Sequence, residues 1–121
     1  MCEILVVDDD EQMRAMLAAS LESHGYVVGQ AGGALALFEH LEGRPERLPS
    51  LLICDYRMPG TDGLQVIERI KNEYPMIEII LITAFGDEEI HRRARTLGAA
   101  AVFNKPFDLA SLHRDVEALL R

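Results

Sequence analysis

Polar side chains follow four short apolar runs in this sequence. Three aspartates at residues 8–10 come directly after one run, and Asp55 comes directly after another. Thr83 and Lys105 follow two more runs. Clustered carboxylates repel one another unless a proton or a cation neutralises them, and oxygen ligands favour a hard cation such as Mg²⁺. A carboxylate can also accept a phosphoryl group, whose oxygens a nearby lysine and hydroxyl would stabilise.

The four runs belong to an alternation of strand and helix patterns along the whole chain. Continuous apolar runs are typical of strands buried on both faces of a parallel sheet. We expect strands at residues 3–7, 26–29, 51–54, 77–82 and 101–103, each followed by apolar residues at helical spacing. Asp9 or Asp10, Asp87 and Asp108 are suitable helix N-caps, and Gly25 is suited to a left-handed turn after the first helix.

Apolar residues recur at helical spacing after the first two expected strands. Residues three or four apart lie on the same side of a helix. One apolar face of the first helix comprises Met13, Met16, Leu17 and Leu21, and the residues that recur at helical spacing in the second are Ala34, Leu35, Leu37, Phe38 and Leu41.

The alternation predicts an α/β fold, a single doubly wound five-stranded parallel sheet with five helices. Connections between parallel strands are right-handed, so helices cover both faces of the sheet. The carboxyl ends of the strands then share one edge, which is where ligands bind in open α/β sheets. We therefore expect Asp8, Asp9, Asp55, Thr83 and Lys105 to form one site.

Each member of this set also has a structural interpretation. Asp9 and Asp10 are common helix caps, Asp55 could start a turn, Thr83 could close a β-branched strand, and Lys105 could be a solvated turn residue. Four independent coincidences on one edge of one sheet are much less probable than one shared site.

The composition limits the classes of protein to consider. The 121 residues suit one domain, residues 1–121, and the 49% hydrophobic content is enough for a core. The net charge of -8 argues against direct binding of nucleic acid, which requires a basic surface. No apolar run approaches the ~20 residues of a membrane span. The buried context of Cys54 and the absence of a CxxC pair suggest a reduced, cytoplasmic protein.

Several motifs in this order resemble the receiver domains of two-component response regulators. The matching segments are Val6-Val7-Asp8-Asp9, Asp55-Tyr56-Arg57-Met58-Pro59-Gly60-Thr61-Asp62-Gly63, Leu81-Ile82-Thr83-Ala84, Gly98-Ala99 and Lys105-Pro106-Phe107. These segments have the spacing found in the family, and the resemblance covers essentially the whole chain. The resemblance implies the flavodoxin-like strand order 2-1-3-4-5.

The resemblance also implies roles for individual residues. Asp55 would accept a phosphoryl group from a sensor histidine kinase or a phosphotransfer protein. Asp9 and Asp55 would bind Mg²⁺ with their side chains, Arg57 with its backbone carbonyl, and Asp8 through water. Thr83 would hydrogen-bond the phosphoryl group, Lys105 would pair with it, and Ala84 would leave room for it. The peptide bond before Pro106 would be cis.

The implied function is a signalling switch used in two-component systems and phosphorelays. Such a switch catalyses its own phosphorylation and dephosphorylation. The lifetime of the phosphoryl group would depend on the residues at positions Arg57 and Phe85. Its partners would be an output domain or a downstream protein, with a possible phosphorylation-dependent homodimer. In the family these partners bind the face formed by the fourth helix, the fifth strand and the fifth helix, where this chain has His91, Arg92, Arg93 and Arg95.

One position departs from the family pattern. Receivers usually have Tyr or Phe three residues before the lysine, and here that position is Val102. Phe103 follows it, but neighbouring residues in a strand point to opposite faces. Either the switch works without an aromatic side chain, with weaker or different coupling, or Phe103 substitutes through a local irregularity.

Three other functions remain to be compared. A phosphatase of the haloacid dehalogenase type would use Asp8 and Asp10, but Lys105 comes too late in the chain for that family. A flavin carrier would need a hydroxyl- and glycine-rich phosphate loop in place of the three aspartates. A phosphorylation-independent interaction module would not need the complete acidic, hydroxyl and lysine set.

Overall fold

The structure, a computed structural model, describes residues 3–84 and 88–121. Its strands are β1 (Ile4–Val7), β2 (Val28–Ala31), β3 (Leu51–Asp55), β4 (Glu78–Thr83) and β5 (Ala101–Asn104). Its helices are α1 (Glu11–Glu22), α2 (Ala34–Gly43), α3 (Gly63–Glu73), α4 (Glu88–Leu97) and α5 (Leu109–Leu119). The strands form one parallel sheet in the order β2-β1-β3-β4-β5, so the predicted fold class and order are confirmed.

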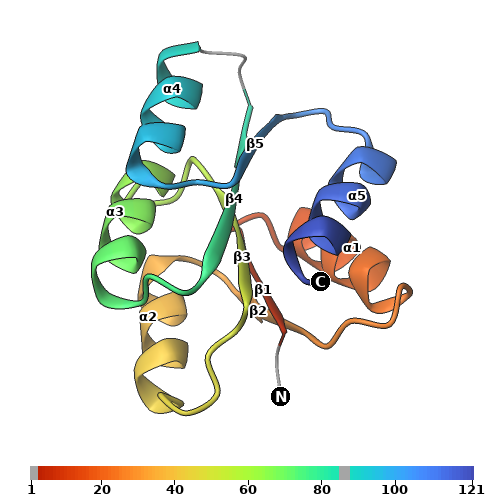
Figure 1. Ribbon diagram of the computed structural model, residues 1–121, viewed down its shortest axis with the longest axis horizontal. Helices are drawn as coiled ribbons and strands as arrows, with labels where there is room; N and C mark the ends of the chain where they lie inside the picture. The colour runs from red at the N-terminus through yellow and green to blue at the C-terminus, as the bar shows by residue number, and fades with distance from the viewer. Residues whose placement is uncertain (1–2, 85–87) are drawn as a thin grey trace.

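Helices cover both faces of this sheet (Figure 1). Helices α2, α3 and α4 lie on one face, and α1 and α5 lie on the other. Successive side chains of a strand point to opposite faces, so each strand contributes to both cores. Leu52 and Leu81 pack beneath α2–α4, whereas Ile53 and Ile80 pack beneath α1 and α5.

The helix ends follow the local sequence. The side chain of Asp10 accepts hydrogen bonds from the amides of Gln12 and Met13, so Asp10 is the N-cap of α1. Asp108 caps α5 in the same way. Gly25 has a φ of 94°, the left-handed conformation expected for it. The proposed cap Asp87 lies outside the described residues, as do Phe85 and Gly86.

One expected strand boundary was wrong, and two apolar helix residues lie outside the core. Strand β2 begins at Val28, two residues later than expected, because the Tyr26 amide still bonds to the carbonyl of Leu21 in the turn after α1. Met16 and Leu35 do not belong to the core, since they are 43% and 76% exposed. The buried stripes of α1 and α2 are therefore narrower than the spacing of their apolar residues indicated.

Within the described residues, no helix has both the length and the apolar character needed to cross a membrane.

Candidate functional site

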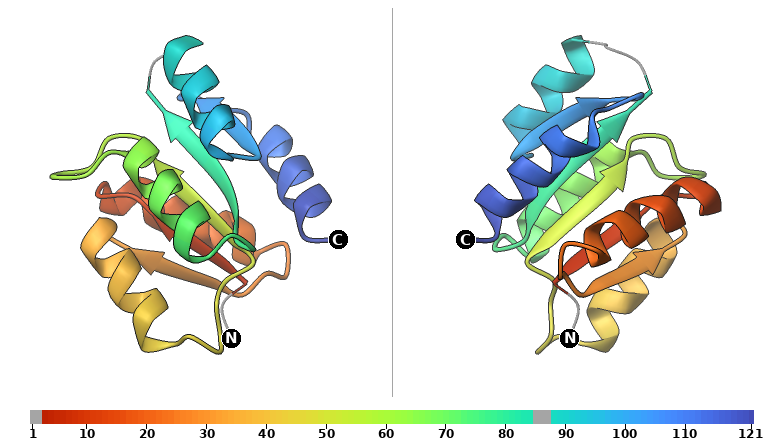
Figure 2. Two further views of the ribbon diagram at one scale, coloured as in Figure 1. Left: turned by 60° about the vertical axis from the view of Figure 1, so that its left-hand side comes forward. Right: turned by 90° about the vertical axis from the view of Figure 1, so that its right-hand side faces the viewer.

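The carboxyl ends of the parallel strands lie along one edge of the sheet (Figure 2). The register places Val7 beside Cys54, Asp55 beside Ile82, and Thr83 beside Asn104. The pairing continues past the strands, because the Lys105 amide donates to the carbonyl of Thr83 at 2.7 Å. The residues that follow these strands are therefore brought together by backbone hydrogen bonds.

An acidic cluster occupies this edge. Oxygen atoms of Asp8, Asp9 and Asp55 all lie within 4.8 Å of one another. Asp8 and Asp55 are buried and Asp9 is exposed. Asp10 does not join the cluster, because its side chain caps α1. Three carboxylates that converge at this distance fit a small, hard divalent cation.

The electrostatics of Asp8 support this interpretation. Burial raises the pKa of Asp8, and the negative charge of Asp55 adds to the effect. The Asp10 amide, which donates to the Asp8 carboxylate at 2.9 Å, opposes it. A cation beside the cluster would favour the ionised carboxylate and offset the burial.

Lys105 reaches the cluster from the β5 side. Its Nζ lies 2.8 Å from Asp55 Oδ1 and 3.6 Å from Asp8 Oδ2. Burial by itself lowers the pKa of Lys105, but the hydrogen bond to Asp55 and the charges of Asp55 and Asp8 outweigh it, so the pKa is raised. Lys105 is therefore a fixed cation next to Asp55. The Lys105–Pro106 peptide bond is cis.

The remaining predicted residues surround this pair. Thr83 is buried at the end of β4, and Ala84 is exposed directly after it. Arg57 is exposed in the loop after β3 and lines an open hollow with Asp9, Tyr56 and Met58. Access to the carboxylates is therefore from the loop side of the sheet edge.

The loop after Asp55 is held in place by contacts that the sequence analysis missed. The Gly63 amide donates to the carbonyl of Tyr56 at 2.7 Å and closes the loop. Asp62 and Gln65 form a capping box, with distances of 2.9 and 3.0 Å, at the start of α3. An Asp followed three residues later by Gln before an apolar run is a signal that could have predicted this cap.

At Val102, where receivers usually have Tyr or Phe, side chains of strand β5 alternate regularly between the two faces of the sheet. Val102 packs on the α2–α4 side, and Phe103 packs on the α1 and α5 side. The Phe103 and Phe107 ring centroids are 6.3 Å apart. Phe103 therefore does not take the place of an aromatic side chain at position 102. Between α4 and β5, His91 Nε2 lies 2.8 Å from Asn104 Oδ1.

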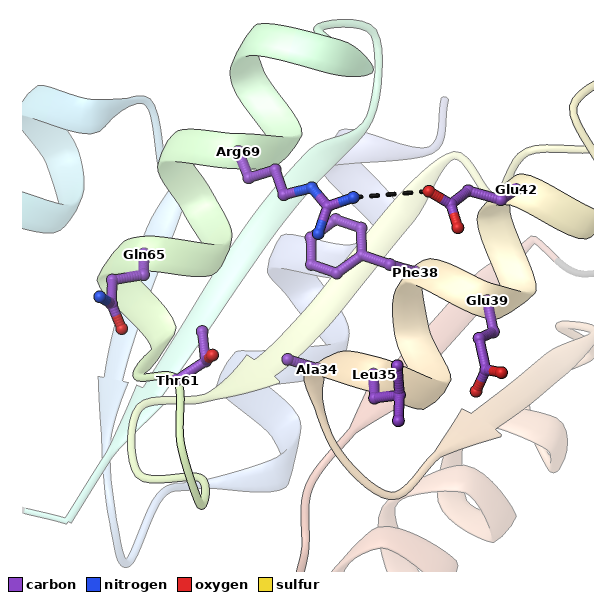
Figure 3. A pocket seen from close by; sticks show the side chains of 8 residues that line it. All are labelled: Ala34, Leu35, Phe38, Glu39, Glu42, Thr61, Gln65 and Arg69. Atoms are coloured by element: carbon purple, nitrogen blue, oxygen red, sulfur yellow. Dashed lines mark hydrogen bonds and ion pairs between the residues drawn. The ribbon is translucent and has the colours of Figure 1, made fainter.

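A separate groove lies between α2 and α3 (Figure 3). The guanidinium of Arg69 sits 3.7 Å from the centre of the Phe38 ring and pairs with Glu42. Thr61, from the loop after β3, lines the same groove. None of the clustered acids, Thr83 or Lys105 lines it. The groove is therefore distinct from the site at the sheet edge.

The fold and the site together define a class of protein. It is a flavodoxin-like α/β domain with a carboxylate cluster and a lysine at the carboxyl edge of the sheet. The family model described as "Response regulator receiver domain" matches residues 4–117. The chain belongs to this family, the receiver domains of two-component response regulators, as the sequence motifs had indicated.

Known proteins of the family show the extent of the similarity. Sporulation initiation phosphotransferase F of Bacillus subtilis is 31% identical over 98% of this chain and 93% of its own length. The DNA-binding transcriptional regulator NtrC of Escherichia coli is 36% identical over 88% of this chain but only 22% of its own length. The crystal structure of the receiver domain of NtrX from Brucella abortus has a TM-score of 0.87 and 29% identity, and 97% of each chain is covered.

Proposed function

We propose that Asp55 is the phosphoacceptor of a signalling switch and that it receives the group from a phosphohistidine. The donor would be a sensor histidine kinase or a phosphotransfer protein. An Asp55 carboxylate oxygen forms the new bond to phosphorus, the bond from phosphorus to the histidine nitrogen breaks, and the histidine ring retains that electron pair. The observation that supports this most directly is the 2.8 Å contact between Lys105 and Asp55 beside two further carboxylates.

The surrounding residues would hold Mg²⁺ and the transferred group. Asp9 and Asp55 would bind the ion directly, together with the carbonyl of Arg57, and Asp8 would act through water. The ion, when bound, supplies positive charge that offsets the carboxylates and the phosphoryl oxygens. Lys105 would stay paired with the phosphorylated Asp55.

The same groups would catalyse both addition and loss of the phosphoryl group. Thr83 would turn its hydroxyl towards the new oxygens, and Ala84 would leave room for them. The added charge would bias a two-state element towards a partner-binding form. We propose the face of α4, β5 and α5 as that element, which would bind an output domain, a downstream protein or a second copy of the chain.

Among the relatives, a domain of this kind either makes up nearly the whole protein or is one part of a longer chain. The chain spans 93% of the Bacillus phosphotransferase but 22% of the Escherichia coli regulator. We propose that residues 1–121 form one receiver unit, which is compatible with either form. The cytoplasmic location remains a prediction.

Phosphoryl uptake should require Mg²⁺. We expect intact mass spectrometry to show one added phosphoryl group after incubation with acetyl phosphate and Mg²⁺, and none when a chelator removes the metal. The physical reason is that an anionic donor must approach three carboxylates, which repel it without the cation. Equal uptake with and without the metal would contradict the metal site. Steady release of phosphate from added phosphomonoesters would instead indicate that the protein is a phosphatase of the haloacid dehalogenase type.

Val102 should weaken the connection between the site and the partner face. A valine has a restricted χ1 and no ring that could move between core and surface. Backbone amide NMR spectra should therefore show phosphorylation-dependent shifts near Thr83 and Lys105 that fade across α4 and β5. The variant Val102→Tyr should extend these shifts into α4. Shifts that already span α4 and β5 fully in the unchanged protein would exclude the weaker coupling.

A further inference from the structure

Arg14 of α1 makes two hydrogen bonds at the edge of the acidic cluster. Its Nη1 donates to the backbone carbonyl of Asp8 at 2.7 Å, and its Nε donates to Gln30 Oε1 at 3.1 Å. Gln30 belongs to the edge strand β2. The guanidinium therefore links the start of the first loop to a neighbouring strand.

The bonded carbonyl belongs to the peptide group that joins two members of the cluster. The Asp8 amide is held by the carbonyl of Ala31 at 3.2 Å, and the Asp8 carboxylate is held by the Asp10 amide. In the described part of the chain, the Asp9 side chain has no hydrogen bond or ion pair of its own. The direction of the Asp9 carboxylate consequently depends on the orientation of this peptide plane.

We infer that Arg14 is a positioning residue for the cation site. It fixes the Asp8–Asp9 peptide plane so that the Asp9 carboxylate converges with those of Asp8 and Asp55, and Gln30 orients the guanidinium for this task. The turn after β2 lies beside the guanidinium, since a Cβ added at Gly32 would meet Arg14 Nη1 at 3.5 Å, an ordinary contact distance. The inference rests on the proposed function, since it assigns Arg14 a part in Mg²⁺ binding.

The charge of Arg14 has to be separated from its geometry. A positive charge near a divalent cation opposes binding, so removing the charge would favour Mg²⁺ while losing the hydrogen bonds would disfavour it. Arg14→Lys keeps the charge and removes the planar fork that reaches two acceptors at once. This substitution therefore reports on positioning.

Arg14→Lys should bind Mg²⁺ on the order of tenfold more weakly, the scale at which orienting groups around metal ligands act. We would titrate the metal against tyrosine fluorescence, because Tyr56 adjoins Asp55, with no phosphoryl donor present. Arg47→Lys is the matched control, since Arg47 is exposed and its side chain has no hydrogen bond or ion pair in the described residues. The control should bind Mg²⁺ like the unchanged protein.

Gln30→Leu provides a second, independent variant with the charge of Arg14 intact. It should also weaken Mg²⁺ binding, and adding it to Arg14→Lys should cause no further loss, because both act through one contact. Circular dichroism would establish that each variant is folded, and Gln30→Leu decides the question if Arg14→Lys is not. Affinity within twofold of the unchanged protein in the folded variants would overturn the inference alone. An unchanged protein that binds no Mg²⁺ would overturn the proposed function as well.

Discussion

Asp55→Ala is expected to abolish phosphoryl uptake while the protein stays folded. The substitution removes the carboxylate that Lys105 contacts at 2.8 Å, and the alanine methyl group has no lone pair with which to form a bond to phosphorus. The fold should tolerate the change, because burial already raises the pKa of Asp8 and the substitution removes the negative charge that adds to this effect. Lys105, which already lies 3.6 Å from Asp8, can then pair with that carboxylate.

The measurement is intact mass after incubation with acetyl phosphate and Mg²⁺, with circular dichroism as the check on folding. Asp10→Ala is the matched control, since Asp10 adjoins the cluster but caps α1. It should retain uptake and lose about 1 kcal/mol of stability with its cap. Uptake that persists in folded Asp55→Ala would mean that another carboxylate is the acceptor, and Asp8 would be the next one to replace.

Gly63→Ala is expected to destabilise the protein by about 2 kcal/mol, a typical cost of forcing an extra carbon into a filled space. An added Cβ would lie 2.5 Å from Leu81 Cδ1, 2.9 Å from Tyr56 Cα and 3.1 Å from the Asp55 carbonyl oxygen. Leu81 is fully buried, and the other two neighbours are backbone atoms. The loop beside Asp55 would therefore have to move, so Mg²⁺ binding should weaken together with stability.

Urea unfolding would measure this change as a shift of the midpoint concentration, provided that the dependence of the free energy of unfolding on urea concentration stays the same. Gly43→Ala is the matched control, because it is also a helical glycine and a Cβ there meets no atom within 4 Å. It should leave stability unchanged or raise it by roughly 0.5 kcal/mol through helix propensity. Equal midpoints for the two variants would contradict the close packing at Gly63.

Much of the fold could be predicted because the central strands are continuous apolar runs. The runs at β3 and β4 are buried on both faces, so their apolar character is nearly unbroken and their ends are sharp. Strand β2 was misplaced by two residues because it lies at the edge, where partial exposure weakens the pattern. The strand order came from the family resemblance, since alternation of strands and helices is compatible with several orders.

The candidate site was predictable to the extent that it depends on strand ends. Each of Asp55, Thr83 and Lys105 follows a recognisable run, and parallel strands bring their carboxyl ends to one edge. The sequence left open whether Asp9 or Asp10 would cap the first helix. The structure assigns Asp10 to that role and leaves Asp8 and Asp9 for the cluster.

The strand and helix alternation, the chemical groups at the sheet edge and the family could all be predicted from the order of the residues. The packing of Phe103 on the α5 side, the lack of space at Gly63 and the contacts of Arg14 with Asp8 and Gln30 became evident in the folded molecule. This difference follows from the range of the interactions. Hydrophobic periodicity and capping act between residues a few positions apart, whereas these contacts join segments that become neighbours only when the sheet has formed.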